Sequence, residues 1–182
     1  MRRKLLWVLG SIGGLVVVLF LWGLMIPREH AASSAIDLRA APESVWAVVR
    51  DLGAAPAWWP DVTKSERRAD TTGREIWDQV ASGWSMALIV TEDEPPRRFV
   101  TTIEATPDAA FGGSWLYEIV PQQAGTRVRV TEHGWVSNPL FRVVMQFAGT
   151  HGTLDAFLTA LGHRFGQEVT PEHVAPSPRI EP

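Results

Sequence analysis

A run of 22 residues near the N-terminus, residues 5–26, constrains the fold most strongly, because Ser11 is its only residue that is neither apolar nor glycine. As an α-helix the run would be about 33 Å long, which is enough to cross the hydrocarbon core of a bilayer. A single segment in hydrocarbon has to satisfy its own backbone hydrogen bonds, so a helix is the expected form. We therefore predict a transmembrane helix over residues 5–26.

The charges on either side of this run predict its orientation. Residues 2–4 are all basic, whereas Arg28 and Glu29 follow the run with no net charge. By the positive-inside rule, residues 1–4 lie in the cytoplasm, and the chain after this single membrane pass forms an extracytoplasmic domain. A buried core helix and a cleaved signal peptide are the alternatives. Small residues at 31–34 would permit cleavage, although the apolar region is longer than the roughly 7–15 residues of signal peptides.

Two glycines inside the run, Gly10 and Gly14, form a G-x-x-x-G pair. Such pairs allow two membrane helices to approach closely. Glycine is common in membrane helices in any case, so the pair predicts at most a weak homodimer.

The rest of the chain has the composition of one acidic soluble domain. Three of the 17 basic side chains precede the run, so residues 28–182 carry 14 basic and 20 acidic side chains, a net charge of −6. Without a basic patch interleaved with aromatic residues, a nucleic-acid partner is excluded. The absence of cysteine excludes disulfides, cysteine-based zinc sites and thiol nucleophiles. No phosphate-binding loop, dinucleotide-binding or nucleophile-elbow motif occurs, and we expect no cofactor.

Alternation of apolar and polar residues at period two predicts a mostly antiparallel sheet with proline and glycine breaks between its strands. A first helix at about 41–51 has Pro42 in its first turn, and a short second helix over 54–59 ends before Pro60. The predicted strands span residues 33–40, 61–68, 74–81, 84–93, 97–106, 113–120 and 126–136.

The C-terminal helix has the clearest signals. Asn138 is a good N-cap, Pro139 suits the first helical position, and Gly166 ends a segment of about 40 Å with a regular apolar stripe. His151 is the one polar member of that stripe and is flanked by glycines. Four prolines without periodicity predict a flexible tail over residues 167–182.

Three segments of this pattern carry a family resemblance: A-P-E-S-V-W-A-V-V-R-D-L at 41–52, A-W-W-P-D-V at 57–62, and G-T-R-V-R-V-T-E at 125–132 followed by N-P-L-F-R at 138–142. On these segments the chain resembles the SRPBCC superfamily, the START/Bet v 1-like group that includes polyketide cyclase/dehydrase-type proteins. The motif F-G-G-S-W at 111–115 is similar to that of uncharacterised bacterial members.

The resemblance implies an α+β helix-grip fold, with a seven-stranded antiparallel curved sheet around a long C-terminal helix, here preceded by one transmembrane helix. It covers residues 34–166, with a linker over 27–33. Members of the superfamily generally hold an apolar ligand between sheet and helix, and some catalyse cyclisation or dehydration there. They share no single catalytic set, so no catalytic residue can be transferred to this chain.

The tryptophans predict a cavity independently of the resemblance, because a concave sheet with many large rings leaves space that one helix does not fill. We choose inward residues by the more apolar parity of each strand and by the helix stripe. The expected ligand-binding residues are Trp77, Trp84, Met86, Phe99, Trp115, Tyr117, Phe147 and His151.

Two polar residues are candidates for chemistry in that cavity. Strand parity turns Glu132 inward, and His151 points back from the helix stripe, so the two could act as an acid/base pair. The plainer interpretations are a solvent-exposed carboxylate at the sheet rim and a hydrogen-bonded core histidine. His133 and Asp155 could join His151 at a metal, but parity turns His133 outward, so we expect no metal site.

We consider three functions from different classes. The first is a membrane-anchored domain that binds a hydrophobic small molecule, such as a lipid or a polyketide-like compound. The second is a cyclase- or dehydratase-type enzyme that uses Glu132 and His151. The third is an extracytoplasmic module that binds a protein partner and has a filled core with an exposed apolar patch.

Overall fold

The computed structural model describes residues 2–70, 73–81, 83–106 and 108–179, with side chains from residue 10 onward except that of residue 148. Its helices are α1 (Arg2–Met25), α2 (Pro42–Arg50), the 3-10 helix η1 (Leu52–Ala57), α3 (Pro139–Ala148) and α4 (Gly152–Arg164). Its strands are β1 (Glu29–Leu38), β2 (Val62–Arg68), β3 (Glu75–Ala81), β4 (Trp84–Glu94), β5 (Arg98–Ile103), β6 (Phe111–Gln122), β7 (Gly125–Val136) and β8 (Glu172–His173).

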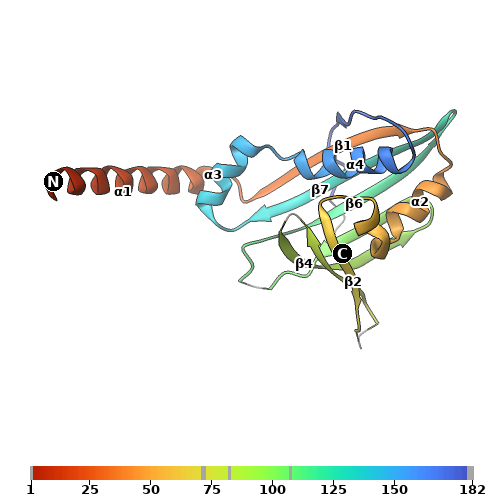
Figure 1. Cartoon of the computed structure of the whole chain (residues 1–182), viewed down its shortest axis with the longest axis horizontal. Coiled ribbons are helices and arrows are strands. Elements are labelled where there is room, and N and C mark those ends of the chain that lie inside the picture. Colours follow the sequence, from red (N-terminus) through yellow and green to blue (C-terminus); the bar gives the residue numbers. More distant parts are fainter. Residues whose placement is uncertain (1, 71–72, 82, 107, 180–182) are drawn as a thin grey trace.

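The strands form one antiparallel sheet in the order β2-β3-β4-β5-β6-β7-β1-β8, and the sheet curves around the helices (Figure 1). The predicted α+β helix-grip class is confirmed, and the seven predicted strands are present within a few residues of their expected bounds. The predicted strand number is wrong by one. The additional strand, β8, has only two residues, and a segment that short has no periodicity to reveal it.

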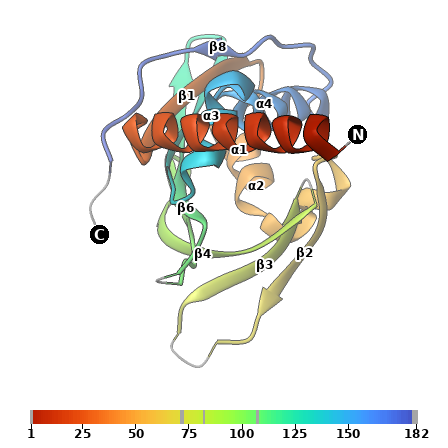
Figure 2. The ribbon, with the colours of Figure 1, turned by 90° about the vertical axis from the view of Figure 1, so that its left-hand side faces the viewer.

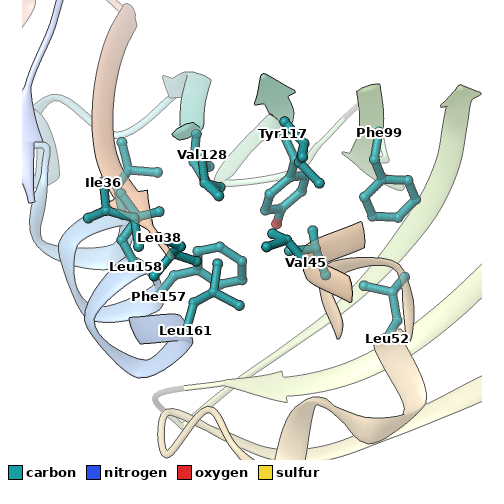
Figure 3. Close-up of a cluster of buried hydrophobic side chains, with 14 of the residues drawn as sticks. Ile36, Leu38, Val45, Leu52, Phe99, Tyr117, Val128, Phe157, Leu158 and Leu161 are labelled. Atoms are coloured by element: carbon teal, nitrogen blue, oxygen red, sulfur yellow. The ribbon is translucent and has the colours of Figure 1, made fainter. Parts of the chain in front are cut away.

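The hydrophobic core lies between the concave face of the sheet and the helices α2, η1 and α4 (Figure 3). In α2 the apolar residues Val45 and Val49 are four apart, and both are buried against the sheet. Phe157, Leu158 and Leu161 of α4 pack onto the inward residues of β1, β6 and β7. Parity along the strands therefore selected the core face correctly.

The predicted single C-terminal helix is wrong, because the structure contains two helices separated by Gly149, Thr150 and His151. Asn138 caps the first helix as expected, with its side-chain oxygen accepting from the backbone N–H groups of Leu140 and Phe141. The backbone of Gly149 has a φ of 80° and a ψ of 163°, which an α-helix cannot accommodate. The apolar stripe continues across the break, so periodicity alone predicted one helix.

Two predicted segments outside the domain also differ from the structure. The linker over residues 27–33 is in part strand, because β1 begins at Glu29 and pairs with the end of β7. In the segment predicted as a flexible tail, His173 pairs with β1 and Ser177 is buried. The Ser177 hydroxyl donates to a carboxylate oxygen of Glu118, and its carbonyl oxygen lies 2.9 Å from Nε2 of His133. Polar contacts on the sheet and the packing of Val169 against the core hold this segment, which shows no apolar periodicity.

Helix α1 projects away from the domain, and only its C-terminal end lies beside α3 (Figures 1 and 2). From Ile12 to Met25 its large apolar side chains are exposed, apart from the half-buried Leu19. Among the residues with described side chains, which in α1 begin at Gly10, no helix is long and apolar enough to cross a membrane. Gly10 and Gly14 have open space around them, and the transmembrane helix and the homodimer stay predictions.

Candidate functional site

A cavity of about 230 Å³ lies on the concave side of the sheet, where β4, β6 and β7 meet the helices α3 and α4. Most of its lining is apolar, and the exposed rings of Trp84 and Phe141 stand at its rim. Trp84 packs edge to face on Phe111 with ring centroids 5.7 Å apart, which fixes one side of the opening. Such an aromatic, partly enclosed space suits an apolar ligand.

Glu132 is the polar centre of this cavity. Nε1 of Trp115 donates to one carboxylate oxygen at 3.1 Å, and Nε2 of His30 lies 3.2 Å from the other. The three residues come from adjacent strands, because Trp115 is directly opposite Glu132 across β6 and β7, while His30 is diagonal to it across β7 and β1. Since a carboxylate only accepts, the hydrogen bond from a neutral His30 requires its proton on Nε2 and leaves Nδ1 as an acceptor.

Gly134 provides the space for the His30 ring. The two residues are opposite each other across β1 and β7, and a Cβ atom at Gly134 would lie 2.5 Å from two ring atoms of His30. Any larger residue would therefore push the imidazole away from Glu132. The contact between His30 and the Glu132 carboxylate thus depends on Gly134, which follows Glu132 by two residues in β7.

A second, smaller cavity of about 60 Å³ continues the first one toward α2 and η1. The two share Ala81, Met86, Trp115 and Thr153 in their linings. Trp58 and Trp59 close the far end, each packed edge to face on Phe157, and within the described chain both buried indole N–H groups lack an acceptor. Buried donors without partners are unusual in proteins.

Tyr117 lies on the floor of the smaller cavity. Burial raises the pKa of its phenol above the ordinary value of 10.0. A hydrogen bond with Thr101 opposes this rise in part, and the negative charge of Glu132 adds a smaller contribution to it. The phenol is therefore neutral at physiological pH. It can donate a hydrogen bond but cannot act as a base.

The structure brings several of the predicted ligand-binding residues together. Trp84, Met86 and Trp115 line the larger cavity, and Tyr117 lines the smaller one beside Met86 and Trp115. Glu132 faces inward as its parity predicted. Their role in binding a ligand stays a prediction.

The other predicted ligand-binding residues lie elsewhere. Phe99 is fully buried in the core, and Trp77 packs over Gly53 with its indole N–H bonded to Glu75. Phe147 is exposed on α3, where its ring meets Trp22 of α1. The helix break changes the direction of this side chain, so its place in the predicted stripe was misleading.

His151 does not face Glu132, and the expectation that it does is wrong. It stands at the N-terminal end of α4, and its ring stacks on that of His173 with centroids 3.8 Å apart. His173 in turn contacts Asp155, whose other oxygen accepts from the Ser34 hydroxyl. These groups join α4 to the sheet edge at β1 and β8, outside both cavities.

His30 is the residue that the sequence analysis missed, because it fell in the predicted linker. The stretch E-H-A-A-S-S has no apolar alternation, and only its pairing with β7 reveals a strand. Phe141 and Met145 of α3 were missed for a related reason, since the helix break turns them toward the cavity. In the described part of the chain, no three His, Asp or Glu side chains are placed to hold a metal ion.

Comparisons with known proteins agree with this architecture. The family model described as "Polyketide cyclase / dehydrase and lipid transport" matches residues 29–166. A START superfamily protein from Mycobacterium smegmatis is 23% identical, with a TM-score of 0.59 over 75% of this chain and 97% of that chain. The Zhui aromatase/cyclase from Streptomyces sp. R1128 is 16% identical, with a TM-score of 0.63 over 76% of this chain and 94% of that one.

Norcoclaurine synthase from Thalictrum flavum is 16% identical, with a TM-score of 0.58 over 75% of this chain and 92% of that chain. A comparison with curated protein sequences found no match. At these identities the solved structures establish the fold alone. The family match covers most of the chain, including both cavities and the strand that carries His30. The predicted resemblance is thereby confirmed, and the chain belongs to the polyketide cyclase/dehydrase and lipid transport family.

Proposed function

We propose that this domain binds a hydrophobic small molecule, a lipid or a polyketide-like compound, in the two adjoining cavities. The observation that carries the proposal is the apolar space between sheet and helices, with polar groups only at defined points along it. The apolar part of the ligand would lie among the aromatic rings, and an oxygen atom of the ligand would meet the His30 imidazole at the polar centre of the larger cavity. The larger cavity is somewhat below the roughly 300–1,000 Å³ of typical ligand sites, and the smaller one extends it.

The test is to extract the purified full chain and identify bound molecules by mass spectrometry, and to titrate it with a fluorescent fatty acid. Ala81 lines both cavities, so Ala81→Phe should weaken binding about tenfold, which corresponds to ~1.4 kcal/mol. On the neighbouring strand β4, Ala87 is adjacent to Met86, which lines the cavities, so the Ala87 side chain points to the other face of the sheet. Ala87→Phe is therefore the matched control and should bind normally. Equal binding by the two variants, or no bound molecule and no titration, would reject the proposal.

The second candidate is an enzyme with Glu132 and His30, in place of Glu132 and His151, as its acid/base pair. The specific observation that favours it is the ordered contact of both groups within one cavity. In a dehydration, the Glu132 carboxylate would take a proton from the carbon beside a carbonyl. For this step His30 would have to be protonated on both ring nitrogens. It would then give one proton to the departing hydroxyl, which leaves as water while the C=C bond forms. Glu132 would release the proton it has taken, and His30 would regain one, before the next turnover.

A β-hydroxyacyl thioester is a suitable probe for this second candidate, because loss of water from it changes its ultraviolet absorbance. Glu132→Gln should lower turnover by about 10²–10⁴-fold. Binding of the fluorescent fatty acid should change little, because the amide keeps the shape of the carboxylate. If the wild-type chain shows no turnover, or if the Glu132→Gln variant shows full turnover, the enzyme candidate is rejected. Ligand binding would then be the one proposed function that remains.

The location of the domain is a separate proposal. The basic residues at 2–4 and the apolar run over 5–26 support a single-pass membrane protein with its C-terminal domain outside the cytoplasm. A reporter fused after residue 182 should be active in the extracytoplasmic compartment. A reporter active only in the cytoplasm would overturn this orientation.

A further inference from the structure

Helix α3 has an exposed apolar side that the domain leaves uncovered. Phe141, Val144 and Phe147 are spaced by three along this side and are 41%, 55% and 77% exposed. Arg142, the one charged residue of the helix, is buried on another side. Three large exposed apolar side chains on one short helix indicate a surface that functions in contact with something apolar.

This side of α3 is continuous with α1. The Phe147 ring packs edge to face on Trp22 of α1, with centroids 6.0 Å apart. Gly23 approaches α3 so closely that a Cβ atom there would lie 2.1 Å from the carbonyl oxygen of Pro139. We call the exposed side chains Trp22, Met25, Phe141, Val144 and Phe147 the junction face.

Arg142 fixes the two helices to each other. Its guanidinium donates to the carbonyl oxygens of Gly23 and Ile26 at the C-terminal end of α1, and to that of Ser137 just before α3. Gly23 lies in the last turn of α1, so the buried cation complements the negative end of the α1 dipole. The junction face is therefore held as one surface.

The junction face borders the mouth of the larger cavity. Phe141 belongs to both, because it is exposed on α3 and also lines the cavity. Met145, one turn further along the same helix, also lines it. An apolar molecule could pass from the junction face into the cavity along the Phe141 ring.

We propose that the junction face lies in the surface of a lipid bilayer, and that the cavity takes a lipid from that bilayer. A lipid surface fits better than a protein partner, because the described part of α1 is apolar and, away from its contact with α3, exposed around the helix, which matches hydrocarbon and not a single protein interface. The second half of the inference rests on the proposed binding function, whereas the first half does not.

The absence of cysteine allows a clean test of bilayer contact. Phe147→Cys in the full chain is labelled with an environment-sensitive fluorophore and reconstituted into phosphatidylcholine vesicles with brominated acyl chains. An amphipathic face of this kind lies about 5–10 Å into the boundary of headgroups and acyl chains, so the label should shift to the blue and be quenched by bromine. Val120→Cys, on an exposed position of β6, is the control and should remain unquenched.

Equal, weak quenching at both positions would overturn bilayer contact. Bilayer contact would also be overturned if, without lipid, the label at Phe147→Cys became more shielded as the protein concentration rose. A second copy of the chain would then cover the junction face.

The lipid source is tested with Val144→Glu combined with Phe147→Glu, which alters the junction face and leaves the cavity lining intact. Uptake of a fluorescent fatty acid from vesicles should slow at least about tenfold, while its Kd in detergent solution stays unchanged. Unchanged uptake would overturn the transfer route. A wild-type chain that binds no fatty acid even in detergent would reject the binding function, and the quenching result would still decide bilayer contact.

Discussion

Gly134 is the residue on which the contact between His30 and Glu132 depends, because it leaves the space that the imidazole occupies. We predict that Gly134→Ala displaces the His30 ring and lowers stability by about 1–3 kcal/mol through overpacking. The measurement is chemical denaturation of the full chain in mild detergent.

A double-mutant cycle separates this effect from a general strain in β7. In a His30→Ala background, Gly134→Ala should cost much less, because the clashing ring is gone. If Gly134→Ala were equally costly in both backgrounds, the glycine would serve the strand itself and not the His30 contact.

Glu75 makes the stability of the folded domain decrease at low pH. The hydrogen bonds from the Arg50 guanidinium, at 2.6 and 2.9 Å, lower the pKa of the Glu75 carboxyl below its ordinary 4.5. The folded state thus holds this proton less tightly than the unfolded state does. The stabilisation is complete above about pH 4.5 and is lost as the pH falls through the folded-state pKa.

We therefore expect Glu75→Gln to destabilise the domain by about 1–3 kcal/mol at pH 7, and the difference from wild type to shrink below pH 4.5. Thermal unfolding across the pH range measures both. Glu66→Gln, in the exposed pair with Lys64 on β2, is the control and should follow wild type at every pH. A difference that persists unchanged at low pH would contradict the assignment to Glu75.

The break between α3 and α4 is the main feature that an element-level analysis of the sequence missed. We predict that Gly149→Ala destabilises the domain by about 1–3 kcal/mol, because its backbone conformation is one that only glycine adopts readily. Gly152→Ala is the matched control. Gly152 is the first residue of α4, and a Cβ atom there would meet no neighbour in the described part of the chain. Alanine at this position should therefore be neutral or stabilising by up to ~1 kcal/mol.

Denaturation of both variants under the same conditions decides the point. A stabilised Gly149→Ala variant would indicate that the two helices prefer to join into one, as the apolar periodicity predicted.

Elements that pack an apolar face on the core could be predicted from the sequence, whereas elements held by polar pairing could not. The seven longer strands and α2 were predictable, because each has one face against the core and shows it as periodicity. The first residues of β1 and the whole of β8 are held by backbone pairing with other strands, which leaves no local pattern. His30 was missed for this reason, whereas Glu132 on the regular strand β7 was found.

One buried side chain links α1 to the rest of the protein by hydrogen bonds. Arg142 is buried between α1 and α3 and donates to three backbone carbonyl oxygens. The planar guanidinium donates to all three carbonyl oxygens at once. Alanine has no donor for them, and the single ammonium group of lysine cannot reproduce the arrangement of the guanidinium N–H groups. The angle between α1 and the sheet should therefore be narrowly defined in the wild-type chain and poorly defined without Arg142.

We predict that Arg142→Ala broadens the distribution of distances between α1 and the sheet. Spin labels on Val18→Cys and Val120→Cys, which are both exposed, measure this distribution by pulsed electron paramagnetic resonance. Arg127→Ala is the control, because Arg127 pairs with Asp37 and Glu172 on the sheet and has no contact with α1. A distribution as narrow in Arg142→Ala as in Arg127→Ala would mean that apolar packing of Trp22 on Phe147 suffices to orient the helix.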